Sequence, residues 1–390
     1  MSSLESCDNQ ATRPARSEKP FVALILQGGG GLGAYHIGAY QALHEAGYAP
    51  DWVAGISIGA INAAIIGGNP AEQRLEKLIQ LWEQISRPDW FTRAWRDLTP
   101  EWFNRYSYWE ALSLGQPHFF NPRPVNPWLA EYGSVQATSF YDTAPLRATL
   151  CRLANFDLVS QGPMRITLGA TDIETGNLVF FDNKNGTPRI EPEHVIASGS
   201  LPPGFAATPI GAKYFWDGGC VSNTPLEAVL DDQPEGHSLV FVIDLWGPSG
   251  KPPSCMEDVL WRQKQIQYAS RTAHAIEAAA AKVNLRHALH ALNAASPGVI
   301  DSPLDEHTFL TSGDRMDIVH IIYHPDKNEI SSSDAEFSRP SIAARYEAGL
   351  ADMRHALASA PWFEHEKPPH LGCVIHRASR GKIETRLGRS

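Results

Sequence analysis

The chain has 390 residues, of which 43% are hydrophobic and 19% are charged, and its formal net charge is −10. This length allows one large domain or two smaller ones, and the apolar content supports a substantial core. The acidic balance argues against binding to a phosphate backbone, so nucleic acid is excluded as an expected partner.

Residues 1–20, MSSLESCDNQATRPARSEKP, lack the apolar stretch of a secretory signal, and we expect a disordered leader there. No run approaches the roughly 18 apolar residues that cross a bilayer. The five cysteines form no CxxC pair and the histidines no HExxH spacing, so neither a disulfide framework nor a metal site is predicted. We expect a cytoplasmic protein without a cofactor, with its oligomeric state open and peripheral contact with a membrane or lipid surface as an option.

After the leader, the sequence contains two apolar runs, each followed by a predicted helix. FVALILQ, residues 21–27, has no polar alternation, which is typical of a strand buried on both faces, and a helix up to Gly47 follows. DWVAG, residues 51–55, is a second short run, and the apolar segment ISIGAINAAIIGG follows it. This alternation of strand and helix predicts a parallel sheet covered by helices. A further helix is expected near 71–86.

Residues 88–140 differ in composition from their surroundings. Trp90, Trp95, Trp102 and Trp109 fall close together, and more aromatic residues and several prolines follow them. One interpretation is a small satellite core beneath an irregular insertion. The other is a lid or wall around an apolar substrate.

Strand and helix patterns resume after this insertion. Two strands joined by a polar turn are expected over 164–183, and further strands over 238–246 and 317–324. Apolar residues at helical spacing predict a long helix over 255–293 and another over 338–359. We therefore expect a catalytic domain over 21–250, a mostly helical extension over 251–365, and a flexible basic tail over 366–390.

A glycine-rich loop follows the first predicted strand. Gly28, Gly30 and Gly33 satisfy the spacing of a dinucleotide-binding loop, as in an NAD-linked dehydrogenase. That interpretation also needs an acidic residue at the end of the second strand, whereas Asp51 precedes this strand. We therefore favour a loop that binds the negative charge of a reaction intermediate.

The second predicted strand runs into Gly55-Ile56-Ser57-Ile58-Gly59, a G-x-S-x-G motif between a strand and a helix. Small residues at 55 and 59 permit the strained turn of a nucleophile elbow, which exposes the Ser57 hydroxyl at a helix N-terminus. Neighbouring parallel strands end at the same edge of a sheet, so the glycine loop is expected beside Ser57. The amides of Gly29, Gly30 and Gly31 are then the predicted oxyanion hole.

The residues alone leave open which group accepts the proton of the serine. KYFWDGG, residues 213–219, predicts a strand that ends at Asp217, with Gly218 and Gly219 in a tight turn, although Asp-Gly is also a common hairpin turn. An α/β-hydrolase would use a histidine instead. Asp172 and Asp244 compete with Asp217 on the same terms, whereas His194, His237 and His274 stand in helical or loop contexts that are typical of surface or packing residues.

The ordered set of motifs resembles the patatin-like phospholipases. It comprises the glycine loop, G-x-S-x-G, Ala197-Ser198-x-x-Leu201-Pro202, Asp217-Gly-Gly and Asn223-x-Pro225, all within 21–250. The resemblance implies a three-layer α/β/α fold with a mostly parallel central sheet and a largely helical C-terminal extension. It further implies a catalytic dyad of Ser57 and Asp217 without histidine, metal or other cofactor, and an oxyanion hole at Gly29 to Gly31.

One position departs from that family, which commonly has Arg or Lys where this chain has Leu32. Residues 331–353 are similar to an extension in a subset of bacterial patatin-like proteins. We predict a serine acyl hydrolase of the lipase or phospholipase A type that cleaves carboxylic esters of lipids. The alternatives are a hydrolase of short hydroxyacid oligomers or acyl thioesters, and a non-catalytic lipid-binding protein.

Overall fold

The computed structural model describes residues 20–87, 110–184, 189–232, 236–296, 315–325, 333–363 and 371–386. The predicted leader, apart from Pro20, lies outside the described residues. So do Trp90, Trp95, Trp102 and Trp109 of the aromatic insertion.

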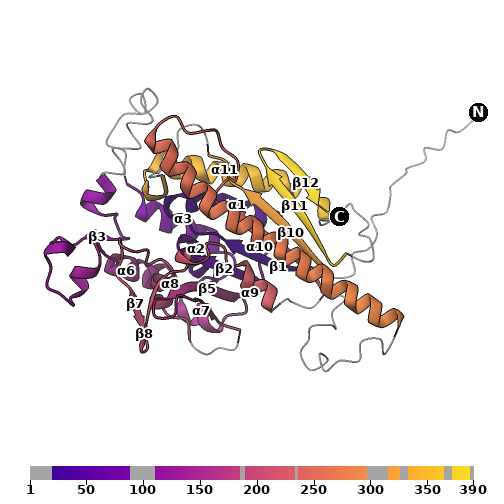
Figure 1. The fold of residues 1–390 in the computed structure, drawn as a ribbon, viewed down its shortest axis with the longest axis horizontal. Helices are drawn as coiled ribbons and strands as arrows, with labels where there is room; N and C mark the ends of the chain where they lie inside the picture. The colour runs from indigo at the N-terminus through magenta and orange to yellow at the C-terminus, as the bar shows by residue number, and fades with distance from the viewer. Residues whose placement is uncertain are drawn as a thin grey trace, which may run out of the picture.

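A ten-stranded, mostly parallel sheet forms the centre of the described part of the chain (Figure 1). Its order is β12-β11-β10-β9-β1-β2-β5-β8-β7, and β6 pairs with β5. The strands are β1 (Phe21–Leu26), β2 (Trp52–Ile56), β5 (Arg165–Asp172), β6 (Leu178–Asp182), β7 (Thr208–Ile210), β8 (Lys213–Asp217), β9 (His237–Asp244), β10 (Arg315–Ile322), β11 (Cys373–Ser379) and β12 (Lys382–Arg386). The pairs β1–β2, β1–β9, β2–β5, β9–β10 and β10–β11 are parallel, as expected for strands joined by helices.

Helices cover both faces of this sheet. They are α1 (Tyr35–Glu45), α2 (Ile58–Gly67), α3 (Arg74–Ile85), α6 (Ala144–Leu153), α7 (Phe156–Gln161), α8 (Pro192–Ser198), α9 (Leu226–Asp231), α10 (Met256–Ala295) and α11 (Arg339–Ser359). Short 3₁₀ turns include η1 (Gly30–Ala34), η4 (Gly218–Cys220) and η6 (Ser333–Ala335). A separate small ribbon pairs β3 (Asn121–Pro122) with β4 (Tyr141–Asp142).

The apolar run of β1 explains the layers. Val22, Leu24 and Leu26 join the larger core cluster, which also contains residues of α1, α2, α3 and α11. Ala23 and Ile25 point to the opposite face and join a second cluster with residues of α9 and α10. Side chains alternate between the two faces of a strand, so a strand without polar residues needs a helical layer on each side. The predicted three-layer α/β/α fold is confirmed.

The C-terminal part of the chain adds strands to the same sheet as well as helices. β10 pairs with β9, β11 with β10, and β12 runs antiparallel to β11. The predicted flexible tail over 366–390 is therefore wrong for residues 373–386, which form two strands at the edge of the sheet. Val374 and Ala378 are buried there, although the basic residues around them hide an apolar strand pattern. The domain boundary at residue 250 stays a prediction.

The long helix α10 crosses one face of the sheet and extends beyond it (Figure 1). Ala269, Ile276 and Val283 are buried as the predicted stripe requires, but Val259 and Ile266 are exposed. Among the described residues, no helix is both long and apolar enough to cross a membrane.

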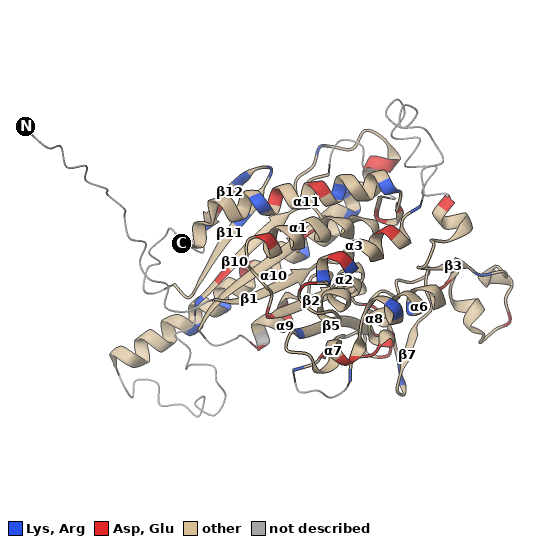
Figure 2. Cartoon of the chain, turned by 180° about the vertical axis from the view of Figure 1, so that it is seen from behind, with Lys and Arg blue, Asp and Glu red and all other residues tan. Residues whose placement is uncertain are grey.

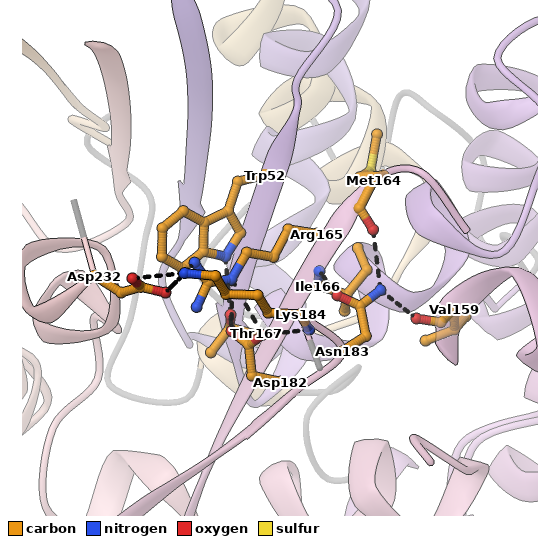
Figure 3. Close-up of polar contacts among 10 residues, drawn as sticks. All are labelled: Trp52, Val159, Met164, Arg165, Ile166, Thr167, Asp182, Asn183, Lys184 and Asp232. Carbon is orange, nitrogen blue, oxygen red and sulfur yellow. Dashed lines mark hydrogen bonds and ion pairs between the residues drawn. The ribbon is translucent and has the colours of Figure 1, made fainter. Parts of the chain in front are cut away.

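Figure 3 shows a polar cluster around Trp52 and Arg165. These residues are paired at the start of β2 and β5, whereas the glycine loop follows the end of the parallel strand β1. The Arg165 guanidinium lies over the indole ring of Trp52, 3.6 Å from its centroid. The same guanidinium forms ion pairs with Asp182 at 2.9 Å and with Asp232 at 2.6 Å. The indole Nε1 of Trp52 donates a hydrogen bond to Thr167 Oγ1 at 2.8 Å. These contacts fix β2, β5 and β6 relative to one another, and so fix where β2 ends.

Candidate active site

Ser57 stands between β2 and α2 in a backbone conformation that L-residues rarely adopt. Its φ is 58° and its ψ is −125°. A Cβ placed on Gly55 would lie 2.3 Å from the Gly59 carbonyl, and one placed on Gly59 would lie 2.1 Å from the Leu26 carbonyl oxygen. Only glycine fits at either position, so the tight turn depends on both. Strain of this kind costs on the order of 1–3 kcal/mol and is concentrated at functional sites.

The motif at the end of α8 holds this turn in place. The Ser57 amide donates to the Ser198 carbonyl oxygen at 3.1 Å and lies 3.0 Å from the Ser198 hydroxyl oxygen. The Ser198 hydroxyl in turn donates to the Gly169 carbonyl at 2.5 Å. Ser198 therefore ties the elbow to β5, which accounts for the Ala197-Ser198 motif in the sequence.

The glycine loop is fixed beside Ser57 by residues from distant parts of the chain. Asn223 Nδ2 donates to the Gly28 carbonyl at 2.7 Å, and the Gly28 amide donates to the Asn223 carbonyl at 3.1 Å. Trp246 Nε1 also donates to the Gly28 carbonyl, at 3.0 Å. A Cβ on Gly28 would lie 2.2 Å from Asn223 Oδ1 and 3.1 Å from Ser57 Cβ. The loop therefore approaches the serine as closely as glycine allows.

The three amides predicted as oxyanion donors differ in their surroundings. Gly29 and Gly30 line the same cavity as Ser57, and Gly30 has a φ of 54°. Gly31 is buried, with its Cα facing the backbone of Glu336. Within the described ranges, no residue outside η1 accepts a hydrogen bond from any of these three amides. Amides without an acceptor are donors ready for a ligand oxygen.

Asp217 ends β8, which pairs antiparallel with β5 and so runs beside the strand next to Ser57. The Asp217 side chain is 1% exposed, and its Oδ1 accepts the Gly219 amide at 2.7 Å. Burial raises the pKa of Asp217 to about 7, although hydrogen bonding to the Ser57 side chain and the Gly219 amide lowers it. A carboxylate with a pKa near neutrality is an effective general base at pH 7.

The Ser57 and Asp217 side chains line one cavity and interact there. Asp217 Oδ2 is buried and has no hydrogen-bond partner among the described residues, so its contact with Ser57 lacks the geometry of an ordinary hydrogen bond. Contacts between catalytic groups are often long before a substrate binds and shorten in the complex. Asp217 Oδ2 is therefore available to accept a proton from the Ser57 hydroxyl.

The competing carboxylates from the sequence are engaged elsewhere. Asp172 accepts Lys213 Nζ at 2.8 Å, and this contact, more than any other, lowers the pKa of Asp172. Asp244 is bonded to His320 at 3.0 Å and to the Trp246 amide at 3.0 Å.

The histidines considered as bases also have other roles. His194 accepts the Glu191 amide at the start of α8, His237 contacts Asp317 at 2.7 Å, and His274 is exposed on α10. None of these three is among the residues that line the cavity.

The cavity around Ser57 has a volume of about 830 Å³. Its walls are mostly apolar, and they come from the aromatic insertion, α2, α8, α10 and the segment before α11. Phe119 and Phe120 belong to the described part of the predicted insertion, which favours the wall interpretation for these two residues. Leu260, Lys264 and Phe337 are lining residues that sequence reasoning missed, since no local motif links them to Ser57.

A family model described as Patatin-like phospholipase matches residues 24–230, more than half of the chain, and another described as Patatin phospholipase matches residues 266–369. The chain is 27% identical over 242 residues to uncharacterized NTE family proteins of Mycobacterium bovis and Mycobacterium tuberculosis, which covers 62% of this chain and 54% of each relative. It therefore spans about half the length of these relatives.

Over 44 residues the chain is 50% identical to neuropathy target esterase sws of Drosophila melanogaster, which covers 11% of this chain and 3% of that protein. Among solved structures, VipD from Legionella pneumophila aligns with 91% of this chain and 71% of its own, at 13% identity and a TM-score of 0.31. The type III effector protein ExoU aligns with 85% of this chain and 53% of its own, at 16% identity and a TM-score of 0.28. At these TM-scores the structural likeness is weak.

Proposed function

The chain belongs to the patatin-like phospholipase family, and from this premise we propose that it is a serine acyl hydrolase that cleaves carboxylic esters of lipids. Ser57 is the proposed nucleophile, Asp217 the general base, and the amides of Gly29 to Gly31 the oxyanion donors. The observation that carries the proposal is the meeting of a strained serine, a buried carboxylate with a pKa of about 7 and unused glycine amides at one apolar cavity.

The proposed reaction proceeds in two halves. Ser57 Oγ attacks the ester carbonyl while Asp217 accepts the hydroxyl proton, and the resulting oxyanion is stabilised by the loop amides. Asp217 then gives the proton to the leaving alcohol, which leaves an acyl group on Ser57. In the second half Asp217 deprotonates a water molecule, which attacks the acyl-enzyme. The bond between the acyl carbon and Ser57 Oγ then breaks, Asp217 returns the proton to Oγ, and the fatty acid is released. Each oxyanion donor contributes about 3 kcal/mol of transition-state stabilisation.

The cavity supports lipid esters over short oligoesters and thioesters. Its volume of about 830 Å³ and its mostly apolar walls suit a fatty acyl chain, which gains free energy by leaving water. A short hydroxyacid oligomer carries closely spaced polar carbonyl groups that such walls do not pair. A purely lipid-binding protein would have no use for the strained conformation of Ser57, so the non-catalytic alternative is less well supported.

We also propose that the protein is cytoplasmic and makes peripheral contact with a lipid surface through the segment between β3 and β4. The segment projects from the body of the molecule, and between residues 123 and 140 Arg123 and Glu131 are its charged residues (Figures 1 and 2). Trp128, Leu129 and Tyr132 are 87%, 82% and 101% exposed. Trp and Tyr favour the interface between water and lipid. Phe120 and Tyr141 flank the segment and line the cavity, so contact here would bring lipid close to Ser57.

The proposed activity is tested with p-nitrophenyl esters of increasing acyl length and with phospholipids of the same chains. We expect turnover that increases from acetyl to medium and long acyl chains and that is lost in Ser57→Ala. The matched control is Ser222→Ala, whose hydroxyl bonds to the Thr224 carbonyl at 3.2 Å. Unchanged turnover in Ser57→Ala, or a clear preference for the shortest esters, would overturn the proposal.

The lipid contact is tested by flotation of the protein with vesicles of phosphatidylcholine. Replacing Trp128 and Tyr132 by serine should reduce the bound fraction by about 10-fold or more, because each buried aromatic side chain contributes about 2 kcal/mol. The control is Leu285→Ser on α10, since this leucine is 62% exposed and lies outside the projecting segment. Equal losses in the control and in the double variant would remove this surface from the proposal.

A further inference from the structure

The C-terminal part of the chain packs directly on the glycine loop. A Cβ on Gly30 would lie 2.0 Å from the Asp334 carbonyl oxygen, and one on Gly31 would lie 2.4 Å from the Glu336 carbonyl oxygen. The backbone of residues 333–336 therefore touches the turn that carries the proposed oxyanion donors. Only glycine permits such a close approach, so these glycines are needed for this contact as well as for the amides themselves.

Arg345 of α11 holds the segment that makes this contact. Its side chain is fully buried, at 1% exposure. Nη1 donates to the Glu336 carbonyl at 2.9 Å and Nη2 to the Ser333 carbonyl at 3.1 Å. Nη1 also lies 3.0 Å from the position of a Cβ on Gly31. One guanidinium thus bonds both ends of the short segment that lies against the loop.

The buried charge of Arg345 is balanced locally. Glu336 Oε2 lies 3.7 Å from Arg345 Nη2, and Glu336 Oε1 accepts the Ser338 amide at 2.7 Å. A buried ion is tolerated when it is paired and hydrogen-bonded, and such an arrangement has a well-defined geometry. The guanidinium is therefore a fixed point rather than a mobile side chain.

The helix that carries Arg345 is itself fixed against the helix that follows the glycine loop. A Cβ on Gly38 of α1 would lie 2.0 Å from the Tyr346 carbonyl oxygen, and one on Gly349 of α11 would lie 2.1 Å from the Tyr35 carbonyl oxygen. The two backbones touch at both glycines. Arg345 lies one residue before this contact, so its position relative to the loop is set by the α1–α11 pair.

We propose that Arg345 is a positioning residue for the oxyanion hole. Arg345 holds the backbone of residues 333–336 in contact with Gly30 and Gly31. This contact keeps their amides at the position where the oxyanion forms in the reaction. This inference rests on the proposed function and gives the C-terminal extension a role in the reaction.

The test compares Arg345→Lys and Arg345→Met with the wild-type chain. Lysine keeps the charge but lacks the planar fork that bonds two carbonyls at once. Displacing catalytic donors by about 1 Å costs about 10²-fold in rate, so we expect kcat to fall by about 10-fold in Arg345→Lys and about 10²-fold in Arg345→Met. KM should stay within about two-fold, because the oxyanion contacts form only in the transition state.

The matched control is Arg354→Met on the same helix. Arg354 is an exposed arginine whose ion pair with Glu45 of α1, at 2.7 Å, also links α11 to α1. A general loosening of the helix pair would slow both variants, whereas the positioning role predicts that kcat of Arg354→Met stays within about two-fold of wild type. If Arg345→Met does not fold, the proposal is tested with Arg345→Lys alone.

Hydrogen exchange of the peptide covering residues 27–35 supplies a measurement that does not depend on turnover. Faster exchange in Arg345→Lys, with wild-type exchange in Arg354→Met, supports the hold of Arg345 on the glycine loop. If the wild-type chain then hydrolyses no ester, the proposed function has failed while this contact between Arg345 and the loop stands. Unchanged exchange in this peptide overturns the proposal whatever the activity. In an active wild type, faster exchange with unchanged kcat overturns it as well.

Discussion

Replacing the buried carboxylate at position 217 probes two properties of the site at once. Asp217→Asn keeps the shape of the side chain and an oxygen for the Gly219 amide, which now lies 2.7 Å from Oδ1. The amide cannot take a proton from Ser57, so we expect hydrolysis to fall by about 10²–10⁴-fold. The variant also lacks a buried charge, so we expect its free energy of unfolding to exceed that of the wild type at pH 8.

The size and sign of this gain follow from the pKa of Asp217, which burial raises from 3.8 to about 7. Between these two values only the unfolded chain ionises at position 217, so the stability of the wild type falls as the pH rises. Above about pH 7 the carboxyl group is ionised in both the folded and the unfolded chain, so the stability of the wild type no longer changes with pH at this site. The difference between the two pKa values corresponds to about 4 kcal/mol, as an upper estimate.

Urea denaturation of both proteins at pH 5 and pH 8 measures this effect. The advantage of Asp217→Asn over the wild type should be about 2–3 kcal/mol larger at pH 8 than at pH 5. In the same range kcat/KM of the wild type should rise with pH, with a midpoint near 7. An equal advantage at both pH values would mean that Asp217 ionises like an ordinary carboxylate, and the reasoning about its burial would be refuted.

Three further substitutions test the supporting structure. Gly59→Ala places a methyl group 2.1 Å from the Leu26 carbonyl oxygen. Urea denaturation should therefore show that the free energy of unfolding falls by about 2 kcal/mol or more, and a fall below about 0.5 kcal/mol would contradict this. Arg165→Met removes ion pairs at the far end of the sheet, so stability should fall by about 2 kcal/mol with kcat nearly unchanged; a large loss of kcat would be unexpected. Asn223→Ala removes the 2.7 Å bond to the Gly28 carbonyl, so kcat should fall about 10-fold or more in a folded protein; an unchanged kcat would contradict this role of Asn223.

The fold of the first 87 residues was accessible to sequence reasoning because its signals are local. The unbroken apolar run of β1 predicts two covered faces, and Val22 and Ala23 indeed belong to different core clusters. The glycines at 55 and 59 predict the tight turn at Ser57, and both positions leave no room for a side chain. Such signals act over a few residues, so they can be read without the tertiary structure.

The choice of Asp217 over Asp172 and Asp244 was not accessible in the same way. All three carboxylates end strands, and only tertiary packing distinguishes them: Asp172 meets Lys213, Asp244 meets His320, and Asp217 keeps a buried oxygen without a hydrogen bond among the described residues. The sequence selected Asp217 only through a family resemblance.

The C-terminal contribution to the site was missed for a related reason. Phe337 lines the cavity and Arg345 bonds the segment against the glycine loop, yet both lie far from Ser57 in the sequence, and the resemblance of residues 331–353 to a family extension assigns them no role. Strands β11 and β12 were missed because basic residues interrupt their apolar pattern. In both cases the partner that gives the residue its role comes from another part of the chain.

The most direct test uses a long-chain alkyl fluorophosphonate, which forms a covalent adduct with an activated serine, followed by mass spectrometry of the digested protein. We expect a single adduct on the peptide that contains Ser57, formed faster as the pH rises through about 7 and much more slowly in Asp217→Asn. An adduct on another residue, or equal labelling rates in the wild type and Asp217→Asn, would contradict a serine activated by the buried carboxylate.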